Sequence, residues 1–330
     1  MDERVSNQIR LLSLVCTIFV VYRHAYTDQV FFAGGIVPNY LQEVRCFLSR
    51  VTSLAVPSFF LISGLFFFRH NYYRDGLYAS MLKKKVRTLL IPFLIWNIVG
   101  GIALFTEKSP LLGCTINERI SNLFLSHWYG PLWYVRDLMI WMLLYPIYGW
   151  IFKVNCKILY AIVFAYVYYC WIPIGSNLMA YEGLLFFFLG GILSKYEHIL
   201  HYKMSNRLLT PLAIVWLSWS MFTPLLLSIW SYKMYVCIGI ILLWQVTKRI
   251  NVLSKRTLKM SQESFLLYVT HIYVLKIIKE IVAVSFYNNG IAALLTYLLG
   301  PIVAVSLISC CGYVWKVYFP KSYEIALGGR

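Results

Sequence analysis

The stretch TIFVVYRHAYTDQ, residues 17–29, decides what kind of fold this chain adopts. An apolar run is interrupted here by Arg23 and His24 before it has clearly left a membrane. A guanidinium and an imidazole cost free energy to desolvate at such a depth. The stretch therefore predicts a membrane-spanning helix that carries ionisable groups toward one end.

The composition supports the same class of protein. Of 330 residues, 60% are hydrophobic and only 13% are charged, whereas soluble domains carry about 25% charged residues. We expect an all-α, polytopic membrane helix bundle of about ten spans, each needing roughly 20 apolar residues. The whole chain, 1–330, is expected to be one membrane domain without a separate soluble domain. The predicted spans are 7–28, 52–69, 86–105, 131–150, 156–173, 181–194, 207–228, 230–247, 264–285 and 291–316.

The formal charge of +17 is distributed unevenly among the connectors. Basic residues concentrate in alternate connectors, and the positive-inside rule then places both termini in the cytoplasm. The excess charge predicts topology and lipid-headgroup contact, not binding to nucleic acid. The N-terminal MDERVSNQIR lacks the basic region and cleavage site of a signal peptide, so the first apolar run is expected to be a retained span. No cysteine pair has metal-ligand spacing, so no metal is expected.

This topology converts sequence position into depth. It places His24 near the outer end of the first span, Arg136 and Asp137 below the outer surface in the fourth, and Glu182 near the outer end of the sixth. Ionisable groups at such depths usually face a cavity or pathway. Other interpretations stay open: His24 can be merely interfacial, Arg23 can snorkel to headgroups, and Asp137 can simply pair with Arg136 or another base.

Several stretches, in order along the chain, are similar to the motifs of one family. The chain resembles the membrane acyltransferase-3 family, whose members move acyl groups from cytoplasmic acyl-CoA onto sugars and other envelope acceptors. The VP-x-FF-x-ISG pattern is the most specific of these motifs. The matching stretches are LLSLVCTIFVVYRHA (11–25), AVPSFFLISGLFFFR (55–69), KKKVRTLLIPFLIWN (83–97), PLWYVRDL (131–138) and SFLLYVTHIYVL (264–275).

The first helix departs from the family pattern at one position. The family usually has an arginine with ten residues between it and the histidine, but Ser13 occupies that position here. The nearest arginine is Arg10, fourteen steps before His24. Fourteen steps of about 100° return to within about 40° of the starting face, so Arg10 can share a helix face with His24.

The resemblance implies an O-acyltransferase, and the residues supply candidate roles. Transfer to a hydroxyl needs a base that works near neutral pH, and histidine has the best-matched pKa. We therefore expect His24 to be the general base. Arg136 is the first candidate to stabilise the oxyanion. Glu182 is expected to orient the imidazole or to bind a sugar hydroxyl.

The donor substrate is expected to be acyl-CoA, with acetyl-CoA preferred and succinyl left open. The family's basic stretch is implicated in donor binding, which makes Lys84 and Arg87 the preferred phosphate ligands, and Arg10 is assigned to the same group. Ordinary positive-inside anchoring is the alternative for each lysine. On the acceptor side, Trp128 and Trp133 can stack on a sugar ring or belong to an aromatic belt.

His271 matches a family position often occupied by histidine and is assigned to substrate binding, with a structural role as the alternative.

The expected partners are acyl-CoA, a saccharide or lipid-linked glycan acceptor and membrane lipids, and a homodimer is left open. The expected location is the bacterial inner membrane. A flippase or exporter of a saccharide is the main rival function, although we find no clear broken-helix or repeat signal of a transporter. A scaffold without chemistry would explain the spans but not the convergent ionisable groups.

Overall fold

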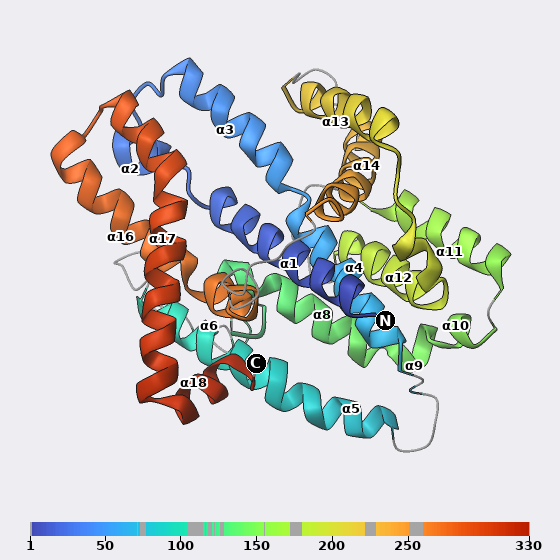
Figure 1. Ribbon diagram of the computed structural model, residues 1–330. Coiled ribbons are helices and arrows are strands. Elements are labelled where there is room, and N and C mark those ends of the chain that lie inside the picture. The colour runs from blue at the N-terminus through green and yellow to red at the C-terminus, as the bar shows by residue number, and fades with distance from the viewer. Residues whose placement is uncertain are drawn as a thin grey trace. The chain divides into compact units, whose positions relative to one another are not determined.

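The structure is a computed structural model that describes residues 2–70, 72, 77–103, 115, 117, 121, 123–125, 129–154, 156–171, 180–221, 229–250 and 260–329. All regular secondary structure in these residues is helical, so the predicted all-α fold is confirmed for this part of the chain (Figure 1). The chain divides into two compact units. Unit 1 comprises Met1–Phe59 and Leu200–Tyr313, and unit 2 comprises Phe60–Ile199 and Val314–Arg330. A single membrane domain over residues 1–330 stays a prediction.

Unit 1 is built around its first helix. The helices of this unit are α1 (Glu3–Arg23), α2 (Asp28–Phe32), α3 (Asn39–Thr52), α13 (Asn206–Met221), α14 (Ile229–Thr247), α16 (Ser264–Phe286) and most of α17 (Gly290–Tyr318). The Asp2 side chain caps α1 by accepting the Val5 N–H at 2.7 Å, which satisfies one of the helix's free donors. Helix α1 packs against α3, α14 and α16, and Figure 1 shows its dark blue ribbon beside α3.

The C-terminal end of α1 fixes the position of His24. The helix ends at Arg23, earlier than the predicted end at residue 28, because His24 leaves helical geometry with φ −103° and ψ 3°. The buried Thr27 then donates its hydroxyl to the Ala293 carbonyl of α17 at 3.2 Å. This bond ties the segment after His24 to α17, and α2 starts directly after it.

Unit 2 contains the remaining helices. They are most of α4 (Ala55–Phe68), α5 (Leu77–Lys85), the π-helix η1 (Val86–Leu90), α6 (Ile91–Ala103), η2 (Gly130–Leu132), α8 (Trp133–Leu143), α9 (Tyr145–Tyr148), α10 (Trp150–Val154), α11 (Lys157–Cys170), α12 (Tyr181–Lys195), η3 (Glu197–His201) through residue 199, and α18 (Pro320–Leu327). Helices α4 and α12 approach closely at Gly64 and Gly190. A Cβ at Gly64 would overlap the Phe187 carbonyl, and one at Gly190 would overlap the Leu61 carbonyl. Small residues thus permit backbone contact here, as at many membrane helix interfaces.

The predicted span 131–150 is not one straight helix. Segments Gly130–Leu143 and Tyr145–Val154 meet at an angle of 53°. Pro146 lies in the first turn of α9, where proline lacks the N–H that would continue the hydrogen-bond ladder of α8. The Ile147 N–H then bonds the Leu144 carbonyl and not that of Leu143, and the Tyr78 hydroxyl of α5 donates to the Leu143 carbonyl at 2.6 Å.

Fewer helices than predicted satisfy simple criteria for crossing a membrane. Within the described residues, five segments are long and apolar enough, or six if the bent pair counts as one span. Helices α11, α12 and α13 have only 14, 15 and 16 residues, and the predicted ends at 172–173 and 222–228 lie outside the described residues. Helix α16 has 23 residues, but every stretch of 18 within it contains Lys276, Lys279 and Glu280. A multi-pass membrane protein is therefore supported, whereas ten spans and cytoplasmic termini stay predictions. The five segments are Glu3–Phe32, Asn39–Phe68, Leu77–Ile102, Ile229–Thr247 and Gly290–Tyr318.

Candidate active site

Two histidines from distant parts of the sequence meet in unit 1. The half-buried ring of His24, at the end of α1, lies with its centroid 5.2 Å from that of His271 in α16. The ring planes are inclined by 50°. A substrate-binding role for His271 was predicted from the sequence, but its contact with His24 was not. The pair forms the strongest candidate for acid–base chemistry in the described residues.

His271 is held rigidly by its own helix. Its side chain is fully buried, and Nδ1 lies 2.8 Å from the Tyr268 carbonyl and 3.2 Å from the Leu267 carbonyl. A carbonyl oxygen can only accept a hydrogen bond, so Nδ1 must carry the proton. In the neutral ring Nε2 is then an acceptor, and it has no hydrogen-bond partner among the described residues.

Charged side chains surround the end of α1. Arg23 donates to the Ser49 carbonyl at 2.5 Å and to the Ser49 hydroxyl at 2.6 Å, which joins α1 to α3. Lys279 of α16 donates to the main-chain carbonyls of His24 at 3.4 Å and Tyr26 at 3.3 Å. These bonds fix the backbone on both sides of His24. Lys279 was not among the predicted site residues, although a lysine inside an apolar helix is a signal of a functional site.

A salt bridge stabilises the segment just beyond His24. Asp28, in α2, pairs with the Arg45 guanidinium of α3, and Asp28 is buried. The Arg45 guanidinium also lies 5.4 Å from the centre of the Tyr26 ring. The C-terminal end of α1 is thus a polar cluster contributed by α1, α2, α3 and α16.

Arg136, predicted to stabilise an oxyanion, lies buried in unit 2 on α8. Its guanidinium pairs with Asp137 at 2.8 Å and donates to the Leu125 carbonyl at 2.6 Å. The second oxygen of Asp137 accepts the Ala180 N–H at 3.0 Å, just before α12 begins. The interpretation that Asp137 pairs with Arg136 is therefore confirmed. The catalytic role of Arg136 stays a prediction.

The other predicted residues of unit 2 have separate surroundings. Glu182 is half-buried in the first turn of α12, and its proposed action on His24 stays a prediction. The centre of the Trp133 ring lies 6.3 Å from the centre of the Phe60 ring of α4. Trp128 lies outside the described residues. The Ser63 hydroxyl of α4 lies 2.9 Å from the Tyr134 hydroxyl of α8.

The predicted donor-binding residues are exposed. Lys84 is near the end of α5, and Arg87 follows in the π-helix η1; such π turns occur frequently at functional sites. Arg87 pairs with Glu324 of α18 at 3.1 Å, a contact the sequence did not predict. Arg10 is exposed on α1 in unit 1. Donor binding by these three residues stays a prediction.

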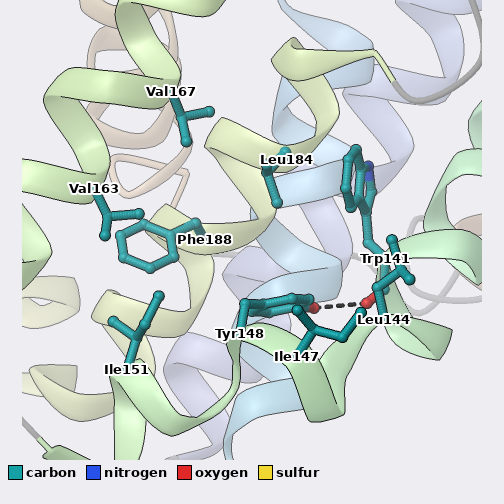
Figure 2. Close-up of a pocket in the computed structure, with 9 residues that line it drawn as sticks. All are labelled: Trp141, Leu144, Ile147, Tyr148, Ile151, Val163, Val167, Leu184 and Phe188. Atoms are coloured by element: carbon teal, nitrogen blue, oxygen red, sulfur yellow. Dashed lines mark hydrogen bonds between the residues drawn. The ribbon is translucent and has the colours of Figure 1, made fainter.

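Unit 2 also contains an apolar cavity of about 220 Å³ (Figure 2). It lies at the bend between α8 and α9, and the Tyr148 hydroxyl beside it donates to the Trp141 carbonyl at 2.6 Å. A lining without polar surface offers no hydrogen bonds to a sugar or a phosphate, so we do not assign this cavity to the chemistry. Its lining residues are Trp141, Leu144, Ile147, Tyr148, Ile151, Val163, Val167, Leu184 and Phe188.

The apolar helices and the paired imidazoles define a multi-pass membrane protein with a candidate acid–base site. A family model described as an acyltransferase domain matches residues 7–314. The chain therefore belongs to the acyltransferase-3 family, and the predicted resemblance and enzyme class are confirmed at the level of the family.

A curated relative and the solved structures add two further findings. The chain is 28% identical over 229 residues to the succinoglycan biosynthesis protein ExoH of Rhizobium meliloti (strain 1021). The match covers 64% of this chain and 60% of the relative, so the chain spans less than two thirds of that protein. No solved structure matches the chain.

Proposed function

We propose that this chain is an O-acyltransferase of the bacterial inner membrane. It moves an acyl group, in the first instance acetyl, from cytoplasmic acyl-CoA to a hydroxyl of a cell-envelope saccharide on the outer side. The observation that carries the proposal is the family match over residues 7–314. The printed name of the relative, a succinoglycan biosynthesis protein, supports a saccharide acceptor.

His24 is the general base of the proposed reaction. It takes the proton of the acceptor hydroxyl while the hydroxyl oxygen attacks the thioester carbonyl, forming a C–O bond. The tetrahedral intermediate then collapses, the C–S bond breaks, and the coenzyme A sulfur takes the proton back from the imidazolium. The support for this role is the position of His24 within a polar cluster, beside the buried His271.

Arg136 is proposed to stabilise the negative charge that develops on the thioester oxygen. Its pairing with Asp137 supports the role, because a guanidinium already held by a carboxylate and a carbonyl needs little reorganisation. Glu182 is proposed to bind a sugar hydroxyl, and Trp133 and Trp128 to stack on the sugar ring.

The donor phosphates are proposed to bind at Lys84 and Arg87, with Arg10 contributing from α1. Both groups of the Arg87–Glu324 pair are largely exposed, at 74% and 57% of the side chain. Exposed ion pairs of this kind are weak, so a phosphate can replace Glu324 as the partner of Arg87.

The test compares envelope saccharides from a host that lacks the protein, with and without the wild-type chain. Cells are fed an isotope-labelled acyl precursor, and the saccharides are analysed by mass spectrometry. The proposal predicts a mass gain of one labelled acyl group per modified sugar. Saccharide transferred across the membrane without any acyl gain would instead favour a flippase or exporter.

A further inference from the structure

The unpartnered nitrogen of His271 raises a specific question. A buried polar atom without a partner is uncommon in folded proteins, and each instance calls for an explanation. Nδ1 of this ring is occupied by the Tyr268 and Leu267 carbonyls, whereas Nε2 is buried without a partner in the described part of the chain. The ring is therefore oriented by its own helix and has one free acceptor.

His24 is the neighbouring group that can use this acceptor. In a five-membered ring each nitrogen lies about 1.1 Å from the ring centre, given bonds of about 1.35 Å. Centroids 5.2 Å apart therefore allow the two nearest nitrogens to approach to about 3.0 Å, which is hydrogen-bond distance. The half-buried His24 ring sits at a helix end, so it can rotate, whereas the buried His271 ring is fixed by its two carbonyl contacts.

We propose that His271 is the positioning residue for His24: its Nε2 accepts the ring N–H of His24 and leaves the other His24 nitrogen free to act as the base. The contact between the two rings does not depend on the proposed function. Its expected effect on the rate of acyl transfer does rest on that function. A fixed acceptor of this kind selects one tautomer of the catalytic imidazole, as the carboxylate of a serine-protease triad does. Only the neutral form of His271 can accept at Nε2.

Three substitutions of His271 distinguish a role in positioning His24 from a role in packing alone. In His271→Gln an amide oxygen can occupy the place of Nε2. In His271→Asn the amide can still donate to the carbonyls but is too short to reach His24, and His271→Phe keeps a ring but provides neither group. We expect the Gln variant to retain kcat within about 10-fold, and the Asn and Phe variants to lose about 100-fold or more, with KM for donor and acceptor unchanged. Wild-type kcat in the Phe variant would show that the ring only fills space and would overturn the proposal.

A second measurement does not depend on activity. Nitrogen-15 NMR of ring-labelled histidines in the full-length wild-type protein, assigned by single variants, reports which ring nitrogens carry protons. We expect His271 to be protonated on Nδ1 alone, and His24 to occupy one tautomer that becomes a mixture in His271→Phe. Protonation of His271 on Nε2 would overturn the proposal even if the variants fail to fold. A wild-type protein that shows the expected tautomers but transfers no acyl group would refute the proposed function and leave the positioning contact intact.

Discussion

The hydroxyl of Tyr78 donates a hydrogen bond of 2.6 Å to the carbonyl of Leu143, at the point where α8 ends and α9 follows. The following proline breaks the helical hydrogen-bond ladder here, and the tyrosine from α5 bonds to the last carbonyl of α8. The bend of 53° is thus stabilised by a side chain from another helix of the same unit.

Tyr78→Phe should destabilise unit 2 without changing its architecture. The substitution removes one hydrogen bond to a carbonyl and should lower the free energy of unfolding by about 1 kcal/mol. Thermal unfolding in detergent micelles measures the change. Tyr318→Phe is the matched control, since Tyr318 is 72% exposed. Equal stability of both variants would mean that another group satisfies the carbonyl.

Asp137→Asn should lower the stability of unit 2 more than Tyr78→Phe does. It leaves the buried Arg136 guanidinium without its counter-charge, and breaking a buried pair in this way typically costs about 3–5 kcal/mol. The double substitution Arg136→Met with Asp137→Leu should cost less, because it removes both charges together. Unfolding midpoints of the single and double variants test this order. A double variant less stable than the single one would contradict the account of the pair.

The close contact of α4 and α12 predicts a strong effect at Gly64. Gly64→Val places atoms against the Phe187 carbonyl, and backbone cannot shift as easily as a side chain. We expect overpacking to cost about 1–3 kcal/mol or to reduce the folded yield. Gly130→Ala is the control, because a Cβ there meets nothing within 4 Å. A stable Gly64→Val protein would refute this close contact.

The Arg87–Glu324 pair predicts an effect on the donor substrate. Glu324→Gln frees the guanidinium, and because an exposed pair contributes at most about 1 kcal/mol, KM for acyl-CoA should fall by no more than about 5-fold. Arg87→Ala should raise that KM, and both effects should shrink at high salt. Lys321→Gln, exposed on the same helix, is the control. An unchanged KM in Arg87→Ala would move the donor site elsewhere.

Sequence patterns predicted the helices more successfully than their breaks and partners. The spans 181–194 and 230–247 agree closely with α12 and α14, because apolar runs with clear polar flanks define helices locally. The bend near Pro146 was missed, since proline in an apolar run either kinks a helix or ends it. Residues 29–51 were predicted to connect spans, but Asn39–Thr52 forms α3, which contributes Arg45 and Ser49 to the polar cluster.

The candidate site was predictable in part. The position of His24 near the outer end of an apolar run made it a candidate, and the depth inferred for Arg136 and Asp137 in the fourth span made them candidates. The contact between His24 and His271 depends on how α1 packs against α16, which a single sequence does not reveal. The same holds for Lys279, whose bonds to the His24 and Tyr26 carbonyls form only when the two helices meet.

The central claim is acyl transfer with His24 as the base. The most direct test is acyl transfer to envelope saccharide, measured by mass spectrometry for wild type, His24→Ala and His201→Ala at equal membrane levels. His201 is an exposed histidine of the described chain, near Asp2, and serves as the matched control. We predict acylation by wild type and His201→Ala, with at least a 100-fold loss in His24→Ala. Equal acylation by all three proteins would contradict the assignment of His24 as the base.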